Sequence, residues 1–182
     1  MNPFAFLIDI LFQLYATALL IRLLLQWVRA DFYNPISQFI VKITDPVVKP
    51  LRRIIPGFGG IDVATLVLAV LVIALKFILL SLFQSQTLNP IAIAILTLDA
   101  TISLCISIFL YAIIIQAILS WVNPDPYNPA SSLLNSLTFP ILKHFRKLIP
   151  PISGMDISPI FAIITLMFVQ YSIHYIFAST FG

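Results

Sequence analysis

The side chains that could do chemistry are few, and two of the carboxylates stand at matching positions. Asp62 follows the segment FGGI and Asp156 follows the segment SGM, 94 residues later. A carboxylate directly after such a turn can accept a backbone N–H and cap the helix that begins there. Two carboxylates brought together could instead hold a cation. The sequence leaves both roles open.

Arg22 and Gln116 form a second pair of polar positions at the same separation, and both stand inside apolar segments. A charged group in hydrocarbon is costly and marks a candidate functional site. Arg22 also lies about 9 Å before Val28, the expected end of its helix, by the helical rise. Its long side chain could therefore extend to the membrane surface. The sequence is consistent with a side chain that faces the interior of the helix bundle and with one that extends to the membrane surface.

Lys76 and Gln170 form a third pair inside apolar segments. Lys76 lies about 21 Å along its predicted helix from Asp62, which places it in the outer half of a bilayer. A buried ammonium group needs a counter-ion. Asp9 and Asp99, near the outer ends of their helices, are the candidate partners, and such a pair would tie helices together.

Most enzyme chemistries are disfavoured by what the sequence lacks. Glutamate is absent, and a lone Cys105 can form neither an intramolecular disulfide nor a CxxC motif. No recognised Ser-His-Asp spacing or phosphate-binding glycine motif occurs. His174 is more typical of a hydrogen-bonded helix interface than of a metal or haem ligand. We expect no catalytic residue and no cofactor, and nucleic acid is a weak alternative because the basic residues are few.

The elements that position these side chains are membrane-spanning helices. Of 182 residues, 60% are hydrophobic and 9% are charged, whereas soluble domains carry roughly a quarter charged residues. Apolar stretches run over Pro3–Val28, Val63–Phe83, Leu96–Val122 and Ile157–Ala178. Each is long enough to span a bilayer as a helix. The expected fold class is an all-α membrane protein with four transmembrane helices.

The two halves of the chain match each other without a gap at an offset of 94 residues, which predicts repeats over 1–88 and 89–182. The identical pairs include Trp27/Trp121, Asn34/Asn128, Pro35/Pro129, Pro46/Pro140, Lys49/Lys143, Arg52/Arg146, Pro56/Pro150, Gly60/Gly154 and Asp62/Asp156. Because each repeat contributes two spans, both must enter the membrane in the same direction. The repeats are therefore expected to be parallel.

The charges predict the orientation in the membrane. Eight of the ten Lys and Arg residues fall in the two repeated loops, which the positive-inside rule places in the cytoplasm. Both termini would then lie outside. The first 28 residues lack the marks of a cleaved signal peptide and of an organellar transit peptide, so a bacterial inner membrane is the expected location.

Each repeated loop is expected to contain an amphipathic helix. Asn34 and Pro35 are typical of a helix start, and apolar residues follow at helical spacing: Ile36, Phe39, Ile40, Ile43 and Val47. A second start signal at Pro46 predicts a separate short helix running to Pro56. The second loop carries the same two signals at Pro129 and Pro140.

Two placements of these loops remain open. An apolar face beside a basic face is typical of a helix lying on an anionic leaflet, where each basic side chain adds about 1 kcal/mol. Alternatively, the loops pack beneath the bundle as connectors. Trp27 and Trp121 end the first and third spans, where such rings anchor a helix at the membrane boundary.

The repeated segments also resemble a known family. The pair QWVRADFYNPISQFI and SWVNPDPYNPASSLL, each followed by TDPVVKPLRRIIP or TFPILKHFRKLIP, is similar to the YggT family over essentially the whole chain. The resemblance implies the bacterial two-copy form. It implies a non-enzymatic inner-membrane protein linked to assembly of membrane complexes, envelope or division processes, and osmotic-stress tolerance. It brings no catalytic residues, only the paired motif positions given above.

Two functions remain in competition on this sequence. The first is a scaffold or assembly factor whose basic loops engage the anionic inner leaflet and a partner membrane protein. The second is a small ion or solute channel that acts in osmotic adaptation and uses Arg22, Gln116, Lys76 and Gln170. Four helices enclose little volume, so a channel would require several copies of the chain.

Overall fold

The structure is a computed structural model, and it describes residues 3–58, 60–83, 89–122, 128–149 and 156–181. These residues form six helices: α1 (Pro3–Trp27), α2 (Pro35–Arg52), α3 (Val63–Phe83), α4 (Pro90–Val122), α5 (Pro129–Leu148) and α6 (Ser158–Phe181). Helices α1, α3, α4 and α6 are long and apolar enough to cross a membrane. The expected all-helical fold with four candidate spans is confirmed.

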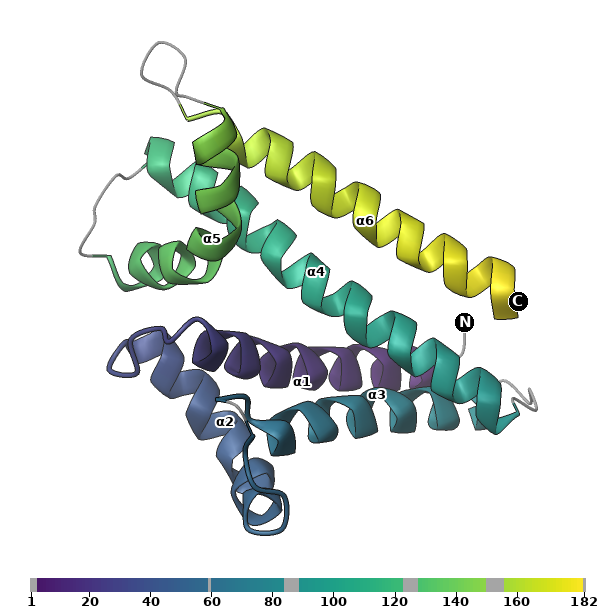
Figure 1. Cartoon of the computed structure of the whole chain (residues 1–182). Coiled ribbons are helices and arrows are strands. Elements are labelled where there is room, and N and C mark those ends of the chain that lie inside the picture. The colour runs from purple at the N-terminus through teal and green to yellow at the C-terminus, as the bar shows by residue number, and fades with distance from the viewer. Residues whose placement is uncertain (1–2, 59, 84–88, 123–127, 150–155, 182) are drawn as a thin grey trace.

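Figure 1 shows α2 and α5 at one end of the four long helices, with both chain termini at the other end. Helix α1 packs along α3, α4 packs along α6, and α4 also contacts α3. The main core is built around leucines of α1, including Leu19 and Leu20, which are fully buried. Ala69 of α3 and Ala112 of α4 lie against them, and such small residues let helices approach closely.

Helix α4 begins six residues before the apolar stretch that predicted it. The side-chain oxygen of Asn89 accepts the backbone N–H of Ala92 at 2.6 Å, and Pro90 occupies the first helical position. Together they make a capped start that the hydropathy pattern does not reveal. The Asn89-Pro90 pair is the sequence signal that could have located the start of α4.

The predicted starts of α2 and α5 are confirmed. The side-chain oxygen of Asn34 accepts from Ile36 N and that of Asn128 accepts from Ala130 N, each at 2.9 Å. The side-chain amide of Asn34 also donates to the carbonyl of Pro129 at 2.7 Å. The beginnings of the two helices are therefore in direct contact.

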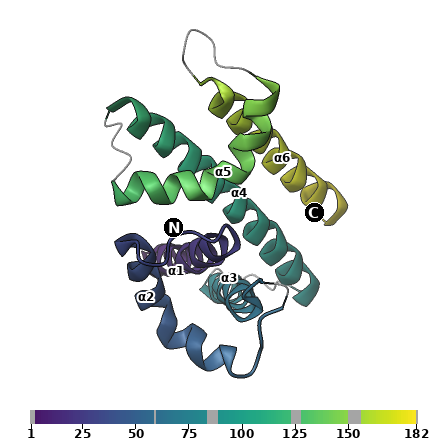
Figure 2. The same cartoon turned by 60° about the vertical axis from the view of Figure 1, so that its left-hand side comes forward.

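The predicted second short helix in each loop is wrong. Helix α2 continues through Pro46 and Pro50 and ends at Arg52, before Pro56, and α5 continues through Pro140. A proline removes one backbone donor and bends a helix without having to end it. Figures 1 and 2 show this bend clearly in α5.

Candidate functional site

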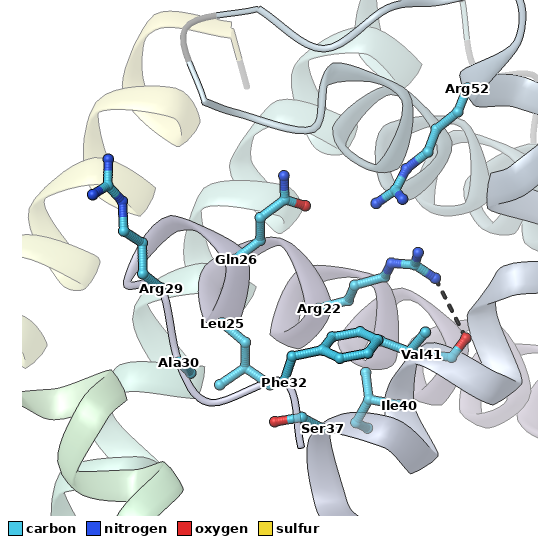
Figure 3. A pocket seen from close by; sticks show the side chains of 10 residues that line it. All are labelled: Arg22, Leu25, Gln26, Arg29, Ala30, Phe32, Ser37, Ile40, Val41 and Arg52. Atoms are coloured by element: carbon cyan, nitrogen blue, oxygen red, sulfur yellow. Dashed lines mark hydrogen bonds between the residues drawn. The ribbon is translucent and has the colours of Figure 1, made fainter. Parts of the chain in front are cut away.

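Arg22 of α1 is buried and paired with α2. Its guanidinium lies 2.8 Å from Asp45 Oδ1 and donates to Thr44 Oγ1 at 2.6 Å. Figure 3 shows a further bond to the carbonyl of Val41, 3.4 Å long. The charge of Arg22 is therefore satisfied inside the protein by a neighbouring helix.

Asp45 pairs both with the buried Arg22 and with a basic residue at the surface. Its Oδ2 lies 2.8 Å from the ammonium of Lys49, which is exposed. Burial raises the pKa of Asp45, but the hydrogen bonds from Lys49 and Arg22 outweigh it and hold the pKa below its usual range. The carboxylate therefore stays ionised at neutral pH and compensates the charge of Arg22.

The second half builds the same contact without charge. Gln116 replaces Arg22, and its side-chain carbonyl accepts from Thr138, the counterpart of Thr44. The Gln116 amide also donates to Asn135 Oδ1 at 3.2 Å. Asp45 is replaced by Phe139, so both charges disappear together across the repeat.

Asp62 and Asp156 each cap a helix and bind an arginine of their own half. Asp62 contacts the guanidinium of Arg52 with Nε 3.0 Å away, and it accepts the backbone N–H of Thr65 at 3.3 Å. Asp156 contacts Arg146 Nε at 2.8 Å and accepts from Ser158 N at 2.9 Å. The capping role is confirmed, whereas the arginine partners were not expected.

The alternative that these two carboxylates meet around a cation is wrong. Both views place the start of α3 and the start of α6 on opposite sides of α1 and α4 (Figures 1 and 2). Within the described ranges, no cluster of three His, Cys, Asp or Glu side chains could hold a metal ion.

These pairs differ in how far they are withdrawn from water. The side chain of Asp62 is 4% exposed, whereas that of Asp156 is 40% exposed. Burial raises the pKa of each carboxyl group, but the bonds from Arg52 and Thr65 to Asp62, and from Ser158 and Arg146 to Asp156, lower each pKa overall. The Asp62–Arg52 pair is therefore less screened by solvent than the Asp156–Arg146 pair.

Lys76 of α3 has the expected partner. Its ammonium lies 3.2 Å from Asp9 Oδ1 and donates to Gln13 Oε1 at 2.9 Å. Asp99, the other candidate, instead contacts His174 Nδ1 at 2.9 Å, so His174 is a helix-interface residue as expected.

Gln170 reproduces the Lys76 contact in uncharged form. Its amide donates to Ser107 Oγ at 3.0 Å and to the carbonyl of Ser103 at 3.3 Å. Ser103 and Ser107 are the counterparts of Asp9 and Gln13. The intramembrane polar residues thus act as matched helix–helix ties in the two halves.

The remaining motif positions shape the ends of the helices. Trp27 is exposed at the end of α1. Gly60 has a positive φ of 83° in the turn closed by hydrogen bonds between Phe58 and Ile61, a conformation that glycine adopts without strain. Pro56 precedes that turn. Pro150, Gly154 and the side chain of Trp121 lie outside the described part of the chain.

The two loop helices present different surfaces. Four apolar residues of α2 are exposed in the chain: Ile36, Phe39, Ile43 and Val47. Helix α5 instead buries Leu133 and Leu137, the counterparts of Phe39 and Ile43, although its Phe139 is exposed. Exposed basic side chains follow on both helices, at Lys42, Lys49, Lys143 and Lys147.

These observations define an α-helical, multi-pass membrane protein in which polar side chains join the helices and basic residues gather on α2 and α5. The model of the CCB3/YggT family matches residues 1–83 and again residues 95–177. The chain belongs to this family.

Relatives match over nearly the full length. Uncharacterized protein PA0392 of Pseudomonas aeruginosa is 46% identical, with 91% of this chain and 85% of the relative aligned. Uncharacterized protein YggT of Escherichia coli K12 is 37% identical, over 99% of this chain and 94% of the relative. The shorter uncharacterized protein ycf19 of Guillardia theta is 39% identical over 34% of this chain and 68% of its own length. No solved structure matches significantly.

Proposed function

We propose that the protein is a non-enzymatic scaffold or assembly factor of the bacterial inner membrane. In this proposal it consists of two parallel repeats, residues 1–88 and 89–182, with α2 and α5 on the cytoplasmic side and both termini outside. Its basic helices engage the anionic inner leaflet and a partner membrane protein. Links to envelope processes and osmotic-stress tolerance come from the family resemblance.

This proposal rests on which polar side chains are paired within the protein and which are exposed. Within the spans, Arg22, Lys76, Gln116 and Gln170 all have partners on neighbouring helices. Outside the spans, basic side chains such as Lys42 and Lys147 are exposed. A transport pathway needs polar groups that face a conduit, so these contacts favour a scaffold over the alternative of a channel.

The exposed face of α2 favours contact with lipid at the membrane surface. Four of its apolar residues, including Phe39 at 60% exposed, are exposed among the described residues, while Lys42 and Arg53 supply positive charge at the same end of the bundle. An amphipathic basic helix of this kind binds an anionic headgroup layer. Helix α5, whose Leu133 and Leu137 are buried, serves in this proposal as the support of α2.

We expect that replacing Lys42, Lys49 and Arg53 with glutamine abolishes crosslinks from α2 to partner proteins. Arg52 is left intact because it holds Asp62. Each lost charge weakens attraction to an anionic surface by about 1 kcal/mol. The measurement is photocrosslinking from residue 39 in native membranes, with neighbours quantified by mass spectrometry.

The matched control keeps the charge, with Lys42→Arg, Lys49→Arg and Arg53→Lys, and its crosslinks should persist. Both variants must insert into the membrane at wild-type levels. Unchanged crosslinks in a correctly inserted glutamine variant would contradict the proposed role of Lys42, Lys49 and Arg53.

A further inference from the structure

A cavity of about 370 Å³ lies between α1 and α2, and its lining combines cationic and apolar side chains. Figure 3 shows the polar residues around it: Gln26 lies between Arg29 on one side and Arg22 with Arg52 on the other. Leu25, Phe32 and Ile40 supply apolar wall. Ser37 also lines the cavity and is buried, and its hydroxyl has no hydrogen-bond partner among the described residues.

Arg29 is held in an unusual backbone conformation at the edge of this cavity. Its φ is +54°. Ala30 N donates to the carbonyl of Leu25 at 2.9 Å, and Arg29 N donates to that of Gln26 at 3.1 Å. These bonds form a Schellman motif in which the left-handed position is usually glycine. An arginine there strains the backbone, which is explained if its side chain is needed.

The three arginines differ in whether a carboxylate compensates their charge. Arg22 and Arg52 are paired with Asp45 and Asp62, so they bring donors to the cavity with little net charge. Arg29 has no such carboxylate partner within the described part of the chain and adds a full positive charge. Guanidinium groups with a free hydroxyl are suited to binding the oxygens of a phosphate group.

The matching cavity in the second half lacks this character. It is lined by Gln116, Ser120 and Arg146, the counterparts of Arg22, Gln26 and Arg52, and the counterpart of Arg29 is Asn123. One arginine therefore remains among these four positions. The matching cavity is therefore less cationic than the cavity of the first half.

We propose that the cavity between α1 and α2 binds a phosphate-type anion, a phosphate monoester or diester, with Arg29 at the edge of the cavity as its charged contact. The proposed function enters only by placing this cavity at the inner leaflet. There the anion could come from an anionic phospholipid headgroup or from free phosphate. The volume and the apolar wall leave room for the group attached to the phosphate.

The test is a titration of the full-length protein in detergent, with binding followed by native mass spectrometry and by the thermal midpoint. The probes are dihexanoyl phosphatidylglycerol, dihexanoyl phosphatidylcholine and inorganic phosphate at constant ionic strength. At least one of the two anionic probes should bind and raise the thermal midpoint of unfolding. Arg29→Gln should weaken that binding about tenfold, the expected effect of losing a charge-assisted hydrogen bond.

Two further variants separate binding from folding. Arg29→Gly relieves the backbone strain, so it should raise the midpoint without ligand and still lose binding. Lys147→Gln removes the same charge from α5 and should leave binding unchanged. Phosphatidylglycerol binding without phosphate binding identifies a lipid headgroup as the ligand, and the reverse identifies free phosphate.

Equal binding of phosphatidylcholine and phosphatidylglycerol, or anion binding that Arg29→Gln does not change, would overturn the inference. Because Arg29 remains intact in the variants that test the scaffold, the two proposals can fail separately.

Discussion

Replacing Asp45 with alanine is expected to lower the free energy of unfolding by about 3–5 kcal/mol, the cost typical of breaking a buried ion pair from one side. The substitution leaves the Arg22 guanidinium buried without its carboxylate. Lys49 also loses a partner, but its ammonium is exposed, so that loss contributes little. Chemical unfolding in detergent micelles, followed by tryptophan fluorescence, measures the change.

The second half of the chain supplies the matched control. The double variant Arg22→Gln, Asp45→Phe copies Gln116 and Phe139 and removes both charges together. It should recover most of the lost stability, because Thr44 can bond to the new amide as Thr138 bonds to Gln116. A double variant as unstable as the sum of the two single variants would show that the charges are not coupled.

Replacing Asp62 with alanine is expected to lower the free energy of unfolding by about 2.5–4 kcal/mol. The change removes a helix cap, worth about 1 kcal/mol, and a charge-assisted bond to Arg52, worth about 1.5–3 kcal/mol. Asp156→Ala is the matched control, and it should cost less because the Asp156–Arg146 pair is far more exposed. Unfolding curves of the two variants in the same detergent give the comparison.

The pH dependence of stability should identify the same group. The pKa of Asp62 is lowered in the folded protein, so its contribution is fully present above the unfolded pKa of about 3.9. That contribution is lost as pH falls through the lower, folded pKa. Asp62→Ala should therefore reduce the acid-induced loss of stability below about pH 4. An identical loss in the variant and the wild type would contradict this assignment.

The helices and their capped starts could be predicted from sequence because the signals are local. Hydropathy locates the four long helices, and Asn34-Pro35 and Asn128-Pro129 mark where α2 and α5 begin. The Lys76–Asp9 pair could be predicted because an intramembrane ammonium has few possible counter-ions. The continuation of α2 through Pro46 could not, because neighbouring helices decide whether a proline ends a helix or bends it.

The partner of Arg22 was missed, although the sequence held a signal for it. Arg22 and Asp45 change together to Gln116 and Phe139 across the repeat. The same compensation occurs where Lys76 and Asp9 become Gln170 and Ser103. Paired loss of opposite charges between two copies of one fold indicates contact, because a lone buried charge would destabilise either copy.

The different burial of α2 and α5 could not be predicted from the spacing of their apolar residues. Both helices carry apolar residues at similar spacing, yet Leu133 and Leu137 of α5 are buried while their counterparts Phe39 and Ile43 of α2 are exposed. Which face is covered depends on how the bent helices pack on the long ones. Local periodicity does not contain that information.

The orientation of the two basic helices is tested most directly by cysteine accessibility. Lys42→Cys and Ser136→Cys occupy matching positions of α2 and α5 and are introduced singly into a Cys105→Ser background. In intact cells, a membrane-impermeant thiol reagent added outside should label neither position, and in inside-out vesicles it should label both. Labelling of the two positions from opposite faces would contradict the parallel repeat and the scaffold proposal together.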